Sequence, residues 1–173
     1  MIAFRPIERT DLPLLKKWRN SDEVRPYVRE YRLLNDSDQE VWYESYLKSR
    51  RKSDFDQEIM IAYSGESIIG VCGFTRIEWR NQRAELTYYR TDNLDVIPLE
   101  SESSLLNALL NKGFNEFNFH KITWPVYSHD PHLLVYQNTF KTEAILKEEY
   151  YWDGKFQDRI YLSITKEEFK NNT

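Results

Sequence analysis

Apolar residues recur along this chain with two periods, one typical of helices and one typical of strands. Leu12, Leu15 and Trp18 fall at helical spacing and predict an amphipathic helix near the N-terminus. Ser37 and Glu40 form a capping box, which predicts the start of a second helix that runs to about residue 49. The N-terminal part of the chain is therefore expected to be mainly helical.

Further along the chain, apolar and polar side chains alternate. Between residues 83 and 90, Ala84, Leu86 and Tyr88 alternate with polar neighbours, which is the period of a strand. A helix is predicted over 99–117, because its leucines recur at steps of one, three and four. The other expected elements are strands over 4–7, 58–63, 67–77, 121–127, 144–152 and 156–164, a short helix over 131–138, and an irregular segment over 20–35.

Helices placed between and after strands indicate an α/β fold. We expect one domain over residues 1–165, with a mixed and mostly antiparallel sheet flanked by helices. A chain of 173 residues fits a single domain, since autonomous domains run to about 100 to 200 residues. Residues 166–173 are mostly polar, and we expect them to form a frayed C-terminal tail.

Composition and charge exclude several classes of protein. The net charge of -4 leaves no basic surplus to neutralise a nucleic-acid backbone, so no nucleic-acid partner is expected. No apolar run approaches the roughly 18 residues of a membrane span, and residues 1–10 lack a signal-peptide pattern, so we expect a cytoplasmic protein without a membrane partner. Cys72 is the single cysteine, and we expect it to be buried as a small hydrophobe.

Several short segments carry a resemblance to a known family. They are Phe4-Arg5-Pro6-Ile7 with Thr10-Asp11, Lys17-Trp18-Arg19-Asn20-Ser21, Ile68-Ile69-Gly70, Ala84-Glu85-Leu86-Thr87-Tyr88-Tyr89 and Asp153-Gly154-Lys155-Phe156-Gln157-Asp158. In this order the chain resembles the Gcn5-related N-acetyltransferase (GNAT) superfamily, in particular its ribosomal-protein and amino-sugar acetyltransferase branch. The resemblance implies a V-shaped split between the strands over 83–90 and 121–127, in which acyl-CoA is held. Unpaired backbone groups of diverging strands can bind the amide arm of CoA much as another strand would.

The resemblance also implies a reaction in which an amine attacks the thioester of acetyl-CoA. A lysine-like amine with a pKa of about 10.4 is mostly protonated at neutral pH, so a base or a water chain to one is needed. Glu85 matches the acidic position of the family and is the candidate base; its structural alternative is a carboxylate that faces solvent or pairs with Arg83. Tyr136 matches the family tyrosine and is the candidate acid for the leaving thiolate; its alternative is a tyrosine packed on the sheet.

The segment expected to bind the pyrophosphate of CoA departs from the family pattern. Val96 and Pro98 stand at the two glycine positions, where valine narrows the backbone approach and proline removes an amide donor. Asp95, Glu100 and Glu102 add negative charge where the pyrophosphate should bind. A loss of about 10² to 10³ in CoA affinity is expected from these changes. The cofactor-binding candidates that the resemblance implies are Tyr88, Tyr89, Arg90, Asp95, Val96, Ile97, Pro98, Leu99, Glu100 and His129.

Two functions follow. The first is an acyl-CoA-dependent N-acetyltransferase that uses acetyl-CoA and a primary amine of an amino sugar or a protein. The second is a degenerate GNAT-fold binding or regulatory protein, for which a homodimer is one expected partner. His120 and His132 lack carboxylates at ligand spacing, so no metal is expected. The candidate acceptor-binding residues are Arg25, Arg29, Tyr31 and Arg32.

Overall fold

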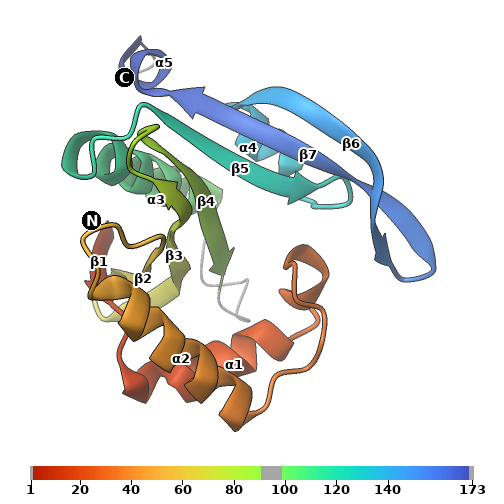
Figure 1. Cartoon of the computed structure of the whole chain (residues 1–173). Helices are drawn as coiled ribbons and strands as arrows, with labels where there is room; N and C mark the ends of the chain where they lie inside the picture. Colours follow the sequence, from red (N-terminus) through yellow and green to blue (C-terminus); the bar gives the residue numbers. More distant parts are fainter. Residues whose placement is uncertain (1, 91–98, 172–173) are drawn as a thin grey trace.

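The computed structural model describes residues 2–90 and 99–171, and of residues 90 and 99–102 it describes the backbone alone. The described strands form one sheet in the order β1-β2-β3-β4-β5-β7-β6 (Figure 1). Neighbouring strands run antiparallel except β4 and β5, which run parallel. This confirms the prediction of an α/β domain with a mixed and mostly antiparallel sheet. The strands are β1 (Ile2–Pro6), β2 (Glu58–Ser64), β3 (Ser67–Glu78), β4 (Arg83–Arg90), β5 (Lys121–Tyr127), β6 (Lys141–Trp152) and β7 (Lys155–Thr165).

Helices cover both faces of the sheet. Figure 1 shows α1 and α2 together on one side of β1 to β4, with α3 on the other side. The described helices are α1 (Leu12–Asn20), α2 (Asp36–Arg50), α3 (Leu99–Asn111), α4 (Leu133–Gln137) and α5 (Lys166–Asn171), with 3₁₀ turns η1 (Arg9–Asp11) and η2 (Arg25–Tyr27). The helix predicted over 99–117 is α3 followed by a π-helical turn, η4 (Lys112–Glu116).

Each face of the sheet has its own hydrophobic core. On the α3 face, Leu105 and Leu109 pack with Phe74 and Leu86, and Cys72 lies fully buried there as expected. On the other face, the predicted helical stripe of α1 packs with α2 and with Val71 of β3. Because side chains alternate along β4, Leu86 belongs to the first core, whereas Tyr89 packs against the second. The two faces of β4 therefore look onto different parts of the molecule.

The start of α2 differs from the predicted one. Asn35, two residues before Ser37, is the N-cap: its side chain accepts a 3.0 Å hydrogen bond from the amide of Asp38, whose carboxylate accepts a 2.9 Å bond from the amide of Asn35. This reciprocal pair satisfies amides of the first turn in the same way as the predicted box of Ser37 and Glu40. Both patterns fit a helix start, and the reciprocal bonds of Asn35 and Asp38 mark the earlier one.

The C-terminal segment also differs from the predicted frayed tail. Residues 166–171 form α5, and Phe169 is 8% exposed because its ring packs 5.3 Å from that of Phe114. Glu168 accepts a 2.9 Å hydrogen bond from the amide of Thr165 and so caps the helix. One buried aromatic ring and one cap thus order a segment that is polar elsewhere.

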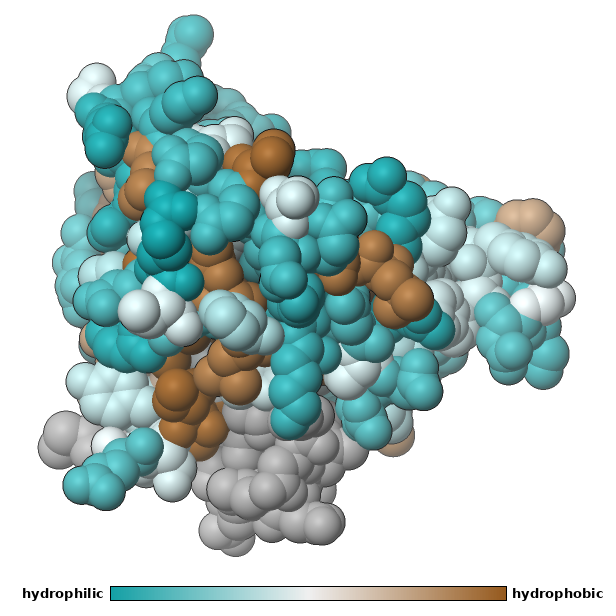
Figure 2. Space-filling model, turned by 90° about the horizontal axis from the view of Figure 1, so that it is seen from below, coloured by the Kyte–Doolittle hydropathy of each residue, from teal (hydrophilic) through white to brown (hydrophobic). Residues whose placement is uncertain are grey.

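The underside of the molecule carries α1 and α2. Seen from there, the surface is mostly hydrophilic, and apolar residues form groups between hydrophilic ones (Figure 2). Among the described helices, none combines the length and the apolar character that a membrane crossing requires.

Candidate functional site

Strands β4 and β5 separate after a short parallel ladder. Arg83 pairs with Lys121, and the last pair joins Glu85 with Thr123. Beyond this pair no ladder contact joins the described parts of the two strands, and their arrows diverge in Figure 1. Pro125 stands two residues further along β5, and its missing amide N–H could not extend a ladder. The predicted split is therefore present.

The split contains a cavity. It has a volume of about 260 Å³ and lies between Glu85 to Tyr89 of β4 and the segment of β5 that begins at Trp124. A second cavity of about 270 Å³ lies toward α4 and is lined by Tyr136. Residues that line both cavities are Tyr27, Val28, Tyr88 and Tyr89. The two cavities thus adjoin at these four residues, three of which are aromatic, and together they form the candidate site, here named the passage.

The segment between α1 and α2 covers this passage. Asn20 fixes the two ends of the segment together, because its side chain donates to and accepts from the backbone of Leu34 at 2.8 Å each. In its middle, the ring of Tyr27 stacks 5.2 Å from that of His129, and Nε2 of His129 lies 3.1 Å from the carbonyl oxygen of Pro26. The contacts of His129 thus hold the covering segment to the turn after β5.

Glu85 lies in the split and is held by two arginines. Its carboxylate accepts a 3.0 Å hydrogen bond from Arg76 and lies 3.7 Å from the guanidinium of Arg29. The side chain of Glu85 is 15% exposed. The alternative pairing with Arg83 is not formed, because Arg83 donates a 2.6 Å bond to Glu78 instead. Glu85 is therefore a positioned carboxylate at the edge of the passage.

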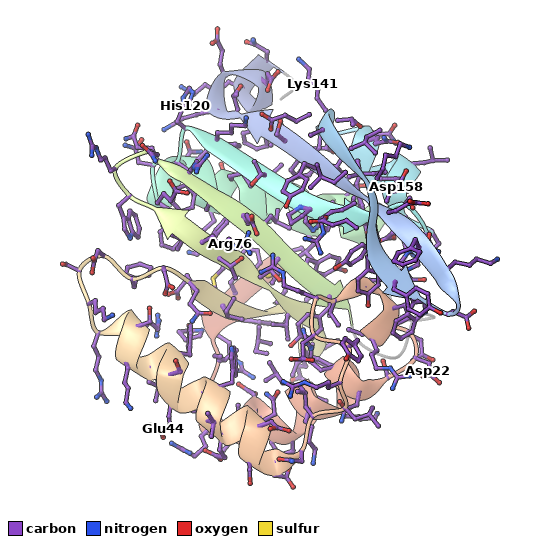
Figure 3. All side chains as sticks on the ribbon, turned by 45° about the vertical axis from the view of Figure 1, so that its right-hand side comes forward. Asp22, Glu44, Arg76, His120, Lys141 and Asp158 are labelled. Carbon is purple, nitrogen blue, oxygen red and sulfur yellow. The ribbon has the colours of Figure 1, made fainter. Side chains whose placement is uncertain are left out.

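A bulge in β3 brings Arg76 to Glu85. The register between β3 and β4 shifts after Thr75, and Arg76 has a φ of 48°, in the left-handed region. A bulge re-aims the side chain of its extra residue. Arg76, labelled in Figure 3 near the middle of the sheet, reaches the same face as Glu85.

Tyr136 is packed and also faces a cavity. It is 4% exposed, and its ring centroid lies 4.2 Å from that of Trp124 on β5. The packing expected in the structural alternative is therefore present. The ring nevertheless lines the cavity beside Tyr88, so packing and a chemical role are compatible.

The predicted acceptor-binding residues separate into two groups. Arg29 lines the cavity in the split, and Arg32 lines a larger cavity of about 640 Å³ between α1, α2 and the sheet. Arg25 instead lies 5.5 Å over the ring of Trp152, and Tyr31 is 64% exposed. Neither of these two lines one of the cavities in or beside the split.

The predicted cofactor-binding residues are only partly described. Tyr88 and Tyr89 lie in the passage, and burial raises the pKa of the Tyr89 phenol. Leu99 and Glu100 form the start of α3. The side chain of Arg90 and the predicted contacts of Asp95, Val96, Ile97 and Pro98 lie outside the described residues.

Sequence reasoning missed several residues of the passage. Tyr27 reaches it because an irregular segment folds back over the sheet, and Arg76 reaches it because of a bulge in β3. Neither feature has a clear sequence signal. Arg19 belongs to the family-like segment over 17–21, so its place in the sequence was a usable signal. The missed residues that line the cavity in the split are Arg19, Tyr27, Val28, Thr75, Arg76, Leu86, Thr87, Trp124, Pro125, Tyr127 and Arg159.

Comparison with known proteins identifies the class. The family model described as acetyltransferase (GNAT) domain matches residues 2–132. The chain belongs to the GNAT acetyltransferase family. This membership identifies an N-acetyltransferase and confirms the family resemblance. The matched residues include Glu85 and His129, whereas Tyr136 lies beyond them.

Solved structures of GNAT acetyltransferases share the whole fold. A spermidine N-acetyltransferase from Vibrio cholerae, in complex with CoA and spermine, superposes with a TM-score of 0.86 at 21% identity, covering 98% of each chain. A spermidine/spermine N-acetyltransferase from the same organism, in complex with manganese ions, gives a TM-score of 0.79 at 19% identity, covering 99% of this chain and 96% of that one. No curated protein sequence matches the chain significantly.

Proposed function

We propose that this protein transfers an acetyl group from acetyl-CoA to a primary amine of a small molecule. The proposal is carried by the cavity between β4 and β5, where the strands stop pairing after Glu85 and Thr123. Backbone N–H and C=O groups along this gap need partners, and the amide arm of CoA supplies them. The spermidine N-acetyltransferase of similar fold holds CoA and an amine, which supports this donor and this class of acceptor.

The two proton transfers of the reaction are assigned to opposite sides of the passage. The acceptor amine must lose a proton before it attacks the thioester. Glu85, with its carboxylate fixed by Arg76 at 3.0 Å, takes that proton directly or orients a water that does. The Glu85 side of the passage is therefore assigned to the amine.

Tyr136 serves the opposite side. A phenol has an ordinary pKa of about 10 and is a proton donor at neutral pH. When the acetyl group leaves, the sulfur of CoA carries negative charge, and Tyr136 supplies the proton that neutralises it. The ring contact with Trp124 at 4.2 Å fixes the phenol's direction.

Calorimetric titration with acetyl-CoA tests the proposal. Saturable binding, followed by release of free CoA when an amine is added, is the expected result. The competing function is a GNAT-fold binding protein that has lost CoA affinity, and it is favoured by Val96 and Pro98 at the glycine positions. No heat and no thermal stabilisation at millimolar acetyl-CoA would select that function.

The loop itself provides a separate test. Replacing both Val96 and Pro98 with glycine should tighten binding of acetyl-CoA by about tenfold or more, since amide contacts to phosphate are worth about 1 kcal/mol or more each. S-acetylpantetheine lacks the pyrophosphate and is the matched control, because its affinity should stay constant. Equal affinity of both proteins for acetyl-CoA would show that the phosphates bind elsewhere.

A further inference from the structure

The cavity in the split is lined by an excess of positive charge. Its arginines are Arg19, Arg29, Arg76 and Arg159, and among its described lining residues the one carboxylate is Glu85. Glu85 is already contacted by two of these arginines. Arg159 is paired with Glu149 at 3.1 Å. Among the described residues, Arg19 is therefore the arginine of this cavity that forms no ion pair, although its charge helps to lower the pKa of the Glu30 carboxylate.

Arg19 stands at the junction of two cavities. It lines both the cavity in the split and the 640 Å³ cavity, together with Thr75, Thr87 and Tyr89. Its guanidinium lies 5.9 Å over the ring of Tyr89. The guanidinium thus occupies the place where a molecule that fills the larger cavity would reach the split.

The hydrogen-bonding capacity of Arg19 is largely unused. Its Nε is buried and has no hydrogen-bond partner among the described residues. Within the same part of the chain its guanidinium makes one hydrogen bond, a long one of 3.5 Å to the carbonyl oxygen of Glu30. The Glu30 carboxylate is bound by Arg32 through two side-chain bonds of 2.9 and 2.8 Å. A guanidinium offers several N–H groups in a planar fork that matches carboxylate and phosphate. An anion would complete this site.

We propose that the acceptor amine carries an anionic group, phosphate or carboxylate, which Arg19 binds at the junction of the two cavities with Arg29 beside it. This inference rests on the proposed acetyl transfer and names its acceptor class. Arg29 is suited to assist, because its side chain is 57% exposed and its 3.7 Å contact with Glu85 is longer than a hydrogen bond. The larger cavity is also lined by two carboxylates, but Glu30 is bound by Arg32 and Asp38 accepts from the amide of Asn35. At the junction a polyamine would therefore meet the positive charge of Arg19.

The phosphates of CoA do not account for Arg19. Arg19 lies on α1, and Tyr89 beneath it packs against the core of α1 and α2. Helix α3, at whose N-terminus the family resemblance places the pyrophosphate, covers the opposite face of the sheet (Figure 1). The anion bound by Arg19 therefore belongs to the acceptor.

Binding of matched amines to the full protein tests the inference. Glucosamine, which carries no anionic group, is the reference. Glucosamine 6-phosphate adds a phosphate to it, and muramic acid adds a carboxylate. Spermidine is the polycationic comparison. Calorimetry in the presence of CoA should show that at least one of the two anionic sugars binds about tenfold or more tightly than glucosamine, and that spermidine binds more weakly. The stronger of the two anionic sugars identifies the anionic group.

Two variants locate the effect. Arg19→Gln should abolish the advantage of the anionic sugar while affinity for acetyl-CoA stays constant, and Arg19→Lys should retain part of it, because lysine keeps the charge but not the fork. Arg80→Gln removes the same charge from the exposed β3–β4 turn, outside the cavities, and should change nothing. Thermal unfolding of each variant checks that the fold is intact.

The results separate this inference from the proposed function. Equal affinity for charged and uncharged sugars, a preference for spermidine, or an anion effect that survives Arg19→Gln would overturn the inference even when acetyl-CoA is bound and turned over. If an anion binds at Arg19 but acetyl-CoA does not bind at all, the anion site would be supported and the acetyltransferase function would be refuted. A loss of acetyl-CoA affinity in Arg19→Gln would assign the arginine to the donor and refute its role toward the acceptor.

Discussion

Arg76 donates a 3.0 Å hydrogen bond to Glu85 across the β3–β4 pair, and the bulge after Thr75 makes this contact possible. In a regular strand, Arg76 and its neighbour Thr75 would face opposite sides of the sheet. The bulge places a fixed cation beside the carboxylate at the point where β4 and β5 part. Glu85 is thus both the candidate base and the β4 residue of the last pair between β4 and β5.

Glu85→Gln should lower kcat by about 10²-fold or more, the usual contribution of general acid–base catalysis. The amide oxygen of glutamine can still accept from Arg76, so the local packing should survive. Steady-state kinetics with a saturating amine would measure the loss, and acetyl-CoA affinity should stay constant. Glu66→Gln, in the exposed β2–β3 turn, is the control. An unchanged kcat for Glu85→Gln would show that this carboxylate serves structure alone.

Tyr136→Phe should lower kcat by about 10² to 10⁴ without weakening acetyl-CoA binding. Phenylalanine retains the ring that packs against Trp124, so only the proton donor is lost. Tyr63→Phe removes a phenol from half-buried β2, outside the cavities, and should leave turnover unaltered. Retained turnover in Tyr136→Phe would assign proton donation to water or to another side chain.

Much of this site could be predicted from the sequence, and the missing part has a physical cause. Alternation along β4 places Glu85 and Tyr89 on one face, and Pro125 is compatible with a strand that loses its partner. Arg76 could not be predicted, because a regular continuation of β3 would send it to the other face. The position of Tyr27 depends on its stacking with His129, a contact between residues far apart in the chain. Local patterns therefore predict strands and faces, whereas bulges and long-range contacts decide which side chains meet.

The contact between Arg5 and Asp11 should make the stability of the N-terminal region depend on pH. Asp11 is 8% exposed and accepts bonds of 2.7 and 2.8 Å from Arg5 and a 2.8 Å bond from the amide of Glu8. These bonds, Arg5 foremost, lower the pKa of Asp11 below its ordinary value of 3.8. Because the pKa of Asp11 is lower in the folded protein than in the unfolded chain, its charge stabilises the fold at pH values above the unfolded-state pKa. This stabilisation is lost as the pH falls through the pKa of Asp11 in the folded protein.

Asp11→Asn should therefore reduce the free energy of unfolding by about 1–3 kcal/mol at pH 7, and the difference from the native protein should shrink below about pH 4. Urea unfolding at pH 7 and at pH 3 would measure both values. Asp22→Asn is the control, because the side chain of Asp22 is 92% exposed and its contact with Arg25 is 3.5 Å; it should change stability by less than about 1 kcal/mol. A pH-independent effect of Asp11→Asn would contradict the assignment to charge.

Two glycines with positive φ should respond very differently to alanine. Gly73 has a φ of +155°, and a Cβ there would lie 2.0 Å from the carbonyl oxygen of Glu58 on the paired strand. Gly65 has a φ of +61°, but a Cβ there meets nothing within 4 Å. Gly65→Ala should cost about 1–2 kcal/mol of backbone strain alone. Gly73→Ala should cost roughly 3 kcal/mol or more, because backbone strain adds to overpacking against a main chain that cannot rotate away. Chemical denaturation of both variants would measure the contrast, and equal losses would show that β2 and β3 can move apart to admit the methyl group.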